Sequence, residues 1–383
     1  MKVLVLGCGR MGSAIAMDMA YSDEVSKVVV GDFYENKAEQ LATKLESDKV
    51  LGQHVDVMDR RATVKLMKNF DIVMSALPYE LSILASKTVV EAGVHLVDLS
   101  YDERQWELDT AAKEAGVTLV PDCGVAPGLA NILAGYSISL MDEAEEIHIL
   151  CGGIPQKPVP PLGYKIVFST QGLVDMYCEK ARIVKDGKIV EVDTLSGLEK
   201  VEFPGVGKLE AFYTDGLSTL LHTMKGKVKD MDEKTARWPG HAEKIEAFRD
   251  TGFFSADPIQ VDGIKTIPHN VAVSILDKAL ILGGEEDVTV LRVDVTGKKD
   301  GNKVEHSFVM VDFFDKQLQV TSMARTTGYT AAIVGRMVAR GDIQDRGVVP
   351  PEIAVAGKLK RFTSELAHRG VKIHEISTVK RCL

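Results

Sequence analysis

Short apolar runs alternate with segments of helical periodicity over the first 125 residues of the chain. The runs show little polar alternation, which is typical of strands buried on both faces of a parallel sheet. They fall at 3–6, 27–30, 71–76, 96–98 and 118–120, with a further strand ending at 55–57; the helical segments fall at 13–20, 36–45, 81–92 and 102–115. Strands and helices at this spacing predict βαβ units, and therefore a doubly wound parallel sheet of the Rossmann type.

The pattern changes near Glu146, where a second mixed α+β domain with a largely antiparallel sheet is expected. The expected strands are 147–150, 165–168, 181–184, 288–295 and 308–314, with helices at 240–249, 270–282, 331–340 and 354–369. Asp186-Gly187 predicts a hairpin turn, and the proline-rich stretch 152–161 resembles a stiff linker. We expect a dinucleotide-binding domain at 1–125 and a substrate-binding and oligomerisation domain at 126–323. The helices of 324–383 are expected to return to the first domain.

Composition excludes several classes of function. The net charge of −9 argues against non-specific nucleic-acid binding, which needs clustered Lys and Arg. No run of about 18 apolar residues exists, so no membrane span is expected. The N-terminus reads as a first strand rather than a signal peptide. The five cysteines, Cys382 among them, are far apart and without zinc spacing, so we expect reduced thiols in the cytoplasm and no metal.

A Gly-x-Gly-x-x-Gly motif follows the first strand directly and opens the first helix. Gly7 permits the tight turn, Gly9 lets the backbone approach a pyrophosphate, and Gly12 permits close packing of helix and strand. Asp32 follows Gly12 by 20 residues, at the end of the second strand, where a carboxylate accepts hydrogen bonds from an adenosine ribose. It would repel a 2′-phosphate, so NAD is favoured over NADP.

Further cofactor contacts are expected at other points of the same sheet edge. Arg10 and Met11 lie inside the glycine loop, and Arg10 would also tolerate NADP. Asp56 and Val57 are placed to meet the adenine, although Asp56 has a solvated loop position as its alternative. Leu77 and Pro78 should line the path toward the nicotinamide.

Several runs, in order along nearly the whole chain, resemble the saccharopine dehydrogenase family. They are Gly7-Cys8-Gly9-Arg10-Met11-Gly12, Ala76-Leu77-Pro78-Tyr79, Val97-Asp98-Leu99-Ser100-Tyr101, Cys123-Gly124-Val125-Ala126-Pro127-Gly128, Cys151-Gly152-Gly153-Ile154-Pro155, Gly163-Tyr164-Lys165 and Arg237-Trp238-Pro239-Gly240-His241. The fourth run has Ala126 where a commoner family form has Asp before the proline.

The resemblance implies NAD-dependent oxidative deamination at the ε-carbon of L-lysine. The semialdehyde formed would close onto the α-amine as a cyclic imine, with release of ammonia and NADH. The ε-amine has a pKa of about 10.4, so a base or an apolar site must deprotonate it before hydride leaves. The α-carboxylate needs a cation, ideally a bidentate one.

The chemistry implied by the resemblance assigns candidate residues. Arg237, with His241 nearby, is the expected carboxylate clamp; the alternative is a helix-capping loop in which Arg237 pairs with a surface acid. Asp98 and Asp122, each at a strand end, are the candidate bases, and a helix N-cap is the alternative for both.

The remaining candidates are Tyr79, Tyr101 and Tyr164 as hydroxyl donors and Cys123 as a pocket-lining residue, with simple packing as their alternative. Among these, Tyr79 is grouped with the catalytic candidates, and Tyr164 and Cys123 with substrate binding. Two other functions stay open: a saccharopine or carboxyspermidine-type dehydrogenase acting on a secondary amine, and a non-catalytic NAD-binding protein. A homo-oligomer is expected.

Overall fold

The computed structural model describes residues 1–380 of the 383-residue chain, and Cys382 lies outside them. The chain forms two compact units. The first comprises Met1–Ser139 and Ala324–Val371, and the second comprises Leu140–Met323 and residues 372–380. The first unit therefore extends beyond residue 125, and the last strand belongs to the second unit rather than the first.

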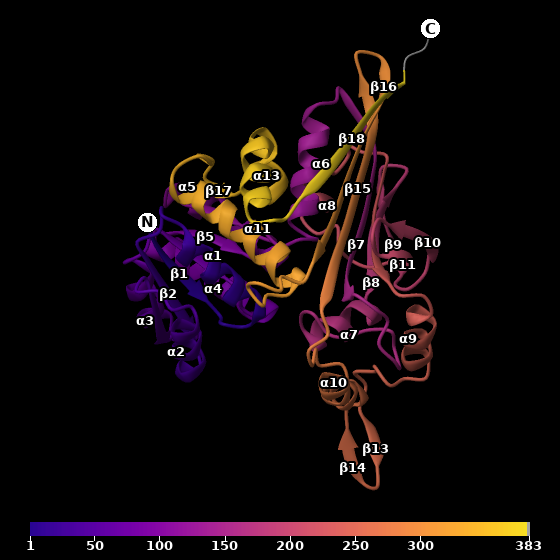
Figure 1. Ribbon diagram of the computed structural model, residues 1–383, viewed down its shortest axis with the longest axis horizontal. Coiled ribbons are helices and arrows are strands. Elements are labelled where there is room, and N and C mark those ends of the chain that lie inside the picture. The colour runs from indigo at the N-terminus through magenta and orange to yellow at the C-terminus, as the bar shows by residue number, and fades with distance from the viewer. Residues whose placement is uncertain (381–383) are drawn as a thin grey trace. The chain divides into compact units, whose positions relative to one another are not determined.

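The first unit is a doubly wound α/β domain, which confirms the predicted fold class. Its seven strands are all parallel, in the order β17-β6-β5-β4-β1-β2-β3 (Figure 1). The elements are β1 (Lys2–Leu6), α1 (Arg10–Tyr21), β2 (Lys27–Asp32), α2 (Glu35–Lys44), β3 (Val50–His54), α3 (Arg60–Met67), β4 (Ile72–Ser75), α4 (Tyr79–Ala92), β5 (His95–Asp98), a 3-10 helix η1 (Glu103–Leu108), α5 (Asp109–Glu114), β6 (Thr118–Val120), α6 (Leu129–Ser139), α11 (Ser322–Ala339), β17 (Gly347–Val348), α12 (Pro351–Ala354), a 3-10 helix η2 (Ala356–Lys358) and α13 (Leu359–His368).

The C-terminal helix α11 packs closely on the glycine-loop helix α1 and on the central strands. A Cβ built on Gly328 would lie 2.8 Å from the Cβ of Ala14, and one built on Gly335 would lie 2.6 Å from the sulfur of Met74. The small residues therefore let α11 approach the sheet at a distance that a larger side chain would forbid.

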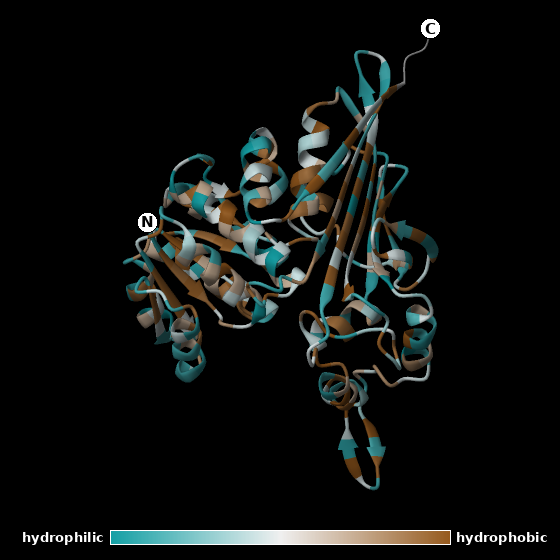
Figure 2. Cartoon of the chain, viewed as in Figure 1, coloured by the Kyte–Doolittle hydropathy of each residue, from teal (hydrophilic) through white to brown (hydrophobic). Residues whose placement is uncertain are grey.

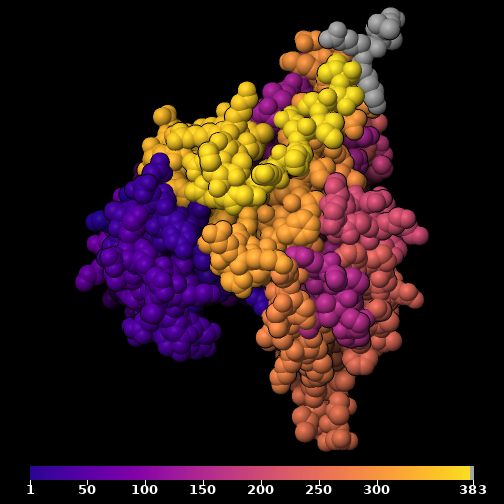
Figure 3. Space-filling model, in the orientation of Figure 1, coloured from indigo at the N-terminus to yellow at the C-terminus, as the bar shows by residue number. Residues whose placement is uncertain are grey.

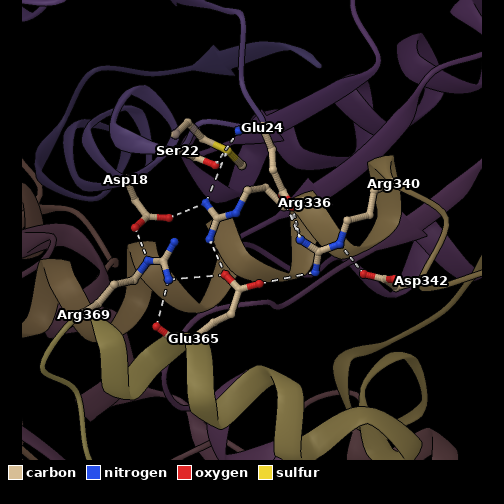
Figure 4. A network of polar contacts seen from close by, with 9 residues as sticks. Asp18, Ser22, Glu24, Arg336, Arg340, Asp342, Glu365 and Arg369 are labelled. Carbon is tan, nitrogen blue, oxygen red and sulfur yellow. Dashed lines mark hydrogen bonds and ion pairs between the residues drawn. The ribbon is translucent and has the colours of Figure 1, made fainter.

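An ion-pair network connects α1, α11 and α13 (Figure 4). Arg336 is 1% exposed and pairs with Asp18 at 2.5 Å and with Glu365 at 3.1 Å. Arg369 contacts both of these acids as well, and Arg340 reaches Glu365 at 3.3 Å. Burial opposes the ionisation of Glu365, but the guanidinium groups around it outweigh burial and lower its pKa. Charge pairing thus holds the C-terminal helices to the start of the domain.

The second unit is built on a nine-stranded mixed sheet with the order β10-β11-β12-β7-β15-β16-β18, to which β8 and β9 are added through β12. Only the β7–β12 pair is parallel among the described pairs of this sheet. The elements are β7 (Glu143–Pro155), α7 (Thr170–Cys178), β8 (Lys180–Lys185), β9 (Lys188–Asp193), β10 (Glu199–Phe203), β11 (Gly207–Tyr213), α8 (Leu220–Thr223), β12 (Asp230–Arg237), α9 (His241–Asp250), β13 (Ile259–Val261), β14 (Ile264–Thr266), α10 (Pro268–Ala279), β15 (Asp287–Lys299), β16 (Asn302–Phe313) and β18 (Ile373–Lys380).

Three local predictions need correction. The third strand spans Val50–His54, and residues 55–57 lie beyond its end. The longer strand was expected because Val55 and Val57 are apolar, and both are buried in the core without belonging to the strand. Residues 165–168 form only an isolated bridge between Ile166 and Ile281. The stretch 152–161 is no linker in its first part, since β7 continues to Pro155. The Asp186-Gly187 turn is confirmed, with positive φ at both residues.

None of the helices within residues 1–380 is long and apolar enough to cross a lipid bilayer.

Candidate functional site

The turn between β1 and α1 depends on close backbone contacts that only glycine allows. Gly7 has a φ of +89°, and a Cβ on Gly12 would lie 2.0 Å from the carbonyl oxygen of Gly7. At Gly9 a Cβ would meet no atom within 4 Å, and no side chain caps the N-terminus of α1. The space beside Gly9 is therefore open in front of a helix N-terminus, as the binding of a pyrophosphate requires.

Asp32 is the last residue of β2, and its carboxylate is held toward the glycine turn. Oδ2 accepts hydrogen bonds from the backbone N–H of Cys8 at 3.0 Å and from the Cys8 thiol at 2.9 Å, while Oδ1 accepts one from the N–H of Tyr34 at 2.9 Å. Burial opposes ionisation, but these bonds lower the pKa of Asp32. Burial and the contact with Asp32 raise the pKa of Cys8 to about 12. A fixed carboxylate and a neutral thiol thus face the turn.

The aromatic side chains beside Asp32 were not predicted from the sequence as part of the site. Phe33 and Tyr34 are 59% and 57% exposed, and the ring of His54 lies 5.8 Å from that of Phe33. The Nδ1 of His54 contacts the carbonyl oxygen of Phe33 at 2.8 Å. Their signal was the aromatic pair that directly follows the acid of β2. Exposed rings at this edge provide a surface on which a purine base can stack.

The other expected cofactor contacts occupy varied environments. Asp56 is half-buried and accepts a hydrogen bond from the N–H of Met58 at 2.9 Å, which shapes the turn after β3. Val57 packs in the apolar core of the first unit. Leu77 is half-buried, and exposed Pro78 lies at the N-cap of α4. Met11 is half-buried and Arg10 is exposed at the first residues of α1.

Asp98 lies inside a buried polar network at the end of β5. One oxygen accepts a hydrogen bond from the hydroxyl of Ser82 at 2.7 Å and the other from the N–H of Ser100 at 3.1 Å. Gln105 donates to Ser82 and also caps the backbone at Asp102. Burial raises the pKa of Asp98 to about 6, although its hydrogen bonds oppose the shift. The carboxyl therefore titrates near neutral pH.

Asp122 and Cys123 follow β6 and lie beside Asp98. The N–H of Cys123 donates to the carbonyl oxygen of Asp98 at 2.8 Å, and Asp122 has a φ of +59°. Both residues are buried, and burial raises the pKa of the Cys123 thiol. Tyr79 differs, because it is 58% exposed at the first residue of α4. Tyr101 accepts a hydrogen bond from the indole of Trp106 at 2.7 Å.

The second unit brings Arg237 and Tyr164 together. Arg237 ends β12 and is 3% exposed, and its guanidinium lies over the ring of Tyr164 at 4.7 Å. One nitrogen donates to the carbonyl oxygen of Ala236 at 3.0 Å, while Nε has no hydrogen-bond partner. No acid pairs with this guanidinium anywhere in residues 1–380. A desolvated guanidinium without an anion is a site for one.

His241 lies against the same group and is neutral. Its Nδ1 contacts the carbonyl oxygen of Leu162 at 2.9 Å and therefore carries the proton. Its Nε2 then accepts a hydrogen bond from the hydroxyl of Tyr177 at 2.8 Å. Burial, and then the charge of Arg237, lower the pKa of His241 to about 3. His241 thus orients Tyr177 and adds no charge beside Arg237.

Glu233 is a second buried ionisable group on β12, and sequence reasoning missed it. It precedes Arg237 by an even number of residues on the same strand, so both side chains share one face of the sheet. Its carboxyl accepts a hydrogen bond from Thr214 at 2.6 Å. Burial raises the pKa of Glu233 to about 8, although Thr214 and Arg237 oppose the shift. The available signal was the position of Glu233 on β12, on the face opposite to the charged residues Asp230, Asp232 and Lys234.

Other cations of the chain, Lys165, Lys157 and Arg325, are differently placed. The ammonium of Lys165 contacts Glu285 at 3.5 Å and the carbonyl oxygen of Ile281 at 3.2 Å. Lys157 is exposed. Arg325 is a residue of the first unit and donates to the carbonyl oxygen of Arg369 at 2.9 Å. Across residues 1–380 no three His, Cys, Asp or Glu side chains are grouped so that they could hold a metal ion.

Comparison with known proteins gives two family matches that cover most of the chain. The model described as "Saccharopine dehydrogenase NADP binding domain" matches residues 3–120, and "Saccharopine dehydrogenase C-terminal domain" matches residues 124–371. The carboxyaminopropylagmatine dehydrogenase of Synechocystis sp. is 24% identical over 98% of this chain and 97% of its own length. The NADP⁺-dependent, L-glutamate-forming saccharopine dehydrogenase of Saccharomyces cerevisiae is 26% identical over 79% of this chain and 69% of its own length.

A solved structure supports the fold. Apo saccharopine dehydrogenase (L-Glu forming) from Saccharomyces cerevisiae aligns with a TM-score of 0.79 at 22% identity, covering 98% of this chain and 99% of that one.

Proposed function

Because the chain belongs to the saccharopine dehydrogenase family, a family of pyridine-nucleotide oxidoreductases, we propose that it catalyses the NAD-dependent oxidative deamination of the ε-amine of L-lysine. This is the activity of a lysine 6-dehydrogenase. The observation that carries the proposal is the buried guanidinium of Arg237, which has no acidic partner within residues 1–380 and an unused Nε. One desolvated cation suits an amine substrate that carries one carboxylate.

The residues around the glycine turn fit a pyridine dinucleotide. The open space at Gly9, the uncapped helix N-terminus and the fixed carboxylate of Asp32 suit a pyrophosphate and an adenosine ribose. A pyridine dinucleotide held by these residues would supply the acceptor for a hydride from the amine-bearing carbon. Arg10, Met11, Leu77 and Pro78 remain predicted contacts of this group.

NAD is favoured over NADP because Asp32 is ionised. Its lowered pKa keeps a negative charge where a 2′-phosphate would otherwise lie. The matched family model names NADP, so the two cofactors must be compared directly. Binding of NADH and NADPH, measured by titration of nucleotide fluorescence, tests the choice: equal affinities would remove the proposed role of Asp32.

In the substrate site, Arg237 would bind the α-carboxylate through two parallel hydrogen bonds while Tyr164 holds the guanidinium plane. Neutral His241 would fix the Tyr177 hydroxyl without competing for the anion. The proton of the ε-ammonium must pass to a base before oxidation. Asp98, Asp122 and Tyr79 remain the candidates for this base, and Glu233 joins them because its carboxyl titrates near neutral pH.

A secondary amine substrate is the second candidate, because the relatives in cyanobacteria and yeast are named for such substrates. Saccharopine carries more carboxylates than lysine and would require further cations. In the second unit, Lys165 is already occupied by Glu285 and by backbone carbonyls, which favours the substrate with one carboxylate. A non-catalytic NAD-binding protein would bind the nucleotide and turn over nothing.

The deciding experiment follows the near-ultraviolet absorbance of reduced nicotinamide with NAD or NADP and a panel of lysine, saccharopine and polyamines. Lysine-dependent reduction with release of ammonia is the expected result. Reduction only with a secondary amine would refute the lysine assignment, and nucleotide binding without turnover of any substrate would refute the enzymatic one. We also expect a cytoplasmic homo-oligomer.

A further inference from the structure

A small β-hairpin in the second unit stands apart from the nine-stranded sheet. Within the described part of the chain, strands β13 and β14 pair only with each other, and Figure 1 shows them extending past α10 at the lower edge of the view. The turn between them is Asp262-Gly263, with φ of +50° and +80°. This pair is the preferred two-residue hairpin turn, so local sequence is sufficient to shape the arm.

The hairpin has one apolar face that is largely exposed to solvent. Its register pairs Val261 with Ile264 and Ile259 with Thr266, so these side chains share one face, while Gln260 and Lys265 share the other. Ile264 is 69% exposed, Ile259 49% and Val261 47%. Brown apolar bands on both strands are visible in Figure 2. An isolated two-stranded hairpin is marginally stable in water, and an uncovered apolar face lowers that stability further.

The apolar surface continues along the chain into α10. This helix buries Ala272 and packs Leu276 against the core of the unit. On its other side, Val271 and Ile275 are 44% and 60% exposed, and their spacing of four places them on one helix face. Ile267, at the N-cap, is 37% exposed. We define the apolar arm as Ile259, Val261, Ile264, Ile267, Val271 and Ile275.

We propose that the apolar arm is an interface with a second copy of this chain. From their exposed fractions, the six residues present on the order of 600 Å² of surface, about three quarters of the roughly 800 Å² per partner that a standard stable interface buries. Such a patch is at the upper limit for a monomer. In the space-filling view, hairpin and helix form a projection that no other segment covers on the visible face (Figure 3).

The composition of the arm suits self-association better than a charged partner. The apolar face of the hairpin carries no charge, since Lys265 lies on the opposite face and Asp262 is confined to the turn, and on α10 the exposed Lys278 follows Ile275 by three residues, at the end of the helix. There is thus no single sign of charge to select an oppositely charged ligand or an anionic lipid surface. A two-fold axis brings identical patches together, so an apolar face meets an apolar face.

The test is the molar mass of the full chain at micromolar concentration, measured by size-exclusion chromatography with light scattering. The variant Ile264→Asp/Ile275→Asp places two charges in the arm. Ile189→Asp/Leu198→Asp is the matched control, because it adds the same charges at side chains of the same unit that are 47% and 55% exposed. The arm variant is expected to halve the mass of the assembly and to weaken association at least 100-fold, while the control keeps the parent mass.

Two results would overturn the proposal: a monomeric parent chain, whether or not it binds vesicles or another protein, or an arm variant that keeps the parent mass. If the double variant loses its far-ultraviolet circular dichroism and is therefore unfolded, the single variant Ile264→Asp, at the most exposed position, replaces it in the test. Hydrogen exchange gives a second readout. The amides of β13 and β14 should become protected as the parent concentration rises, and should stay unprotected in the arm variant.

Discussion

Replacement of Arg237 by methionine separates a ligand-binding role from a structural one. Methionine keeps most of the length and apolar volume of the side chain and removes its charge and donors. Arg237 is 3% exposed and has no acidic partner in the described chain, so the substitution strands no buried carboxylate. The fold would lose a cation–π contact with Tyr164, worth about 2 kcal/mol when desolvated, and one hydrogen bond to Ala236, worth about 1 kcal/mol.

These losses are offset because methionine carries no charge. The desolvation penalty of the buried guanidinium, which is several kcal/mol, disappears in the variant. The free energy of unfolding of Arg237→Met should therefore lie within about 2 kcal/mol of the parent value. Breaking a buried ion pair instead costs about 3–5 kcal/mol. Urea denaturation distinguishes the two, and a loss in the second range would show that Arg237 has a structural partner.

The effect on catalysis should depend on the carboxylate of the substrate. Each charged hydrogen bond is worth about 1.5–3 kcal/mol, so loss of a bidentate pair should lower kcat/KM for lysine by at least roughly 100-fold. An ε-amine that lacks the carboxylate, such as 1,5-diaminopentane, should be turned over by parent and variant alike. Equal losses with both amines would remove Arg237 from carboxylate recognition.

Arg182→Met is the matched control in the same unit. Arg182 is paired with Asp215 at 2.8 Å, and the two side chains are 34% and 21% exposed. Its replacement should lower stability and leave the ratio of kcat/KM between the two amines unchanged.

Three further predictions concern the first unit. Asp32→Ser should weaken NADH binding by roughly 10- to 100-fold and narrow the difference from NADPH, as measured by fluorescence titration; unchanged affinities would contradict the ribose contact. Arg336→Met should lower the free energy of unfolding by about 3–5 kcal/mol, because Asp18 and Glu365 lose a buried partner; a shift below about 1 kcal/mol in urea would show that Arg369 and Arg340 compensate for the loss. Asp98 has a folded pKa of about 6, above its unfolded value of about 3.9, so the folded state binds more protons between these pH values and loses roughly 2–3 kcal/mol of stability as pH rises through them. Asp98→Asn should lack this loss, and parallel pH–stability curves would refute the assignment.

The cofactor-binding turn could be predicted from the sequence because the residues that form it are close together in the chain. The glycines, the helix they open and the acid of β2 lie within one βαβ unit, and each has a backbone reason for its identity. Gly7 requires a positive φ and Gly12 a contact that any Cβ would block. The direction of Asp32 toward Cys8 follows from the pairing of β1 with β2.

The substrate site could be predicted only in part from the sequence. The run from Arg237 to His241 marked the clamp, but the sequence left open whether Arg237 pairs with an acid. The structure shows that no acid does so within residues 1–380 and that Tyr164 lies beneath the guanidinium. The sequence alone could not predict the role of Tyr177 or the raised pKa of Glu233. Both features depend on burial by segments that are distant in the chain.

By itself, the sequence determined the parallel sheet, its glycine turn and the acid that follows it, since hydrophobic periodicity and backbone sterics act over a few residues. Only the tertiary structure decided the rest. Whether Asp98 titrates near neutral pH, whether Arg237 is paired, and which apolar residues of α10 stay uncovered all depend on which distant segments exclude water from a given side chain. Desolvation is a property of the packed chain, and no local pattern of residues encodes it.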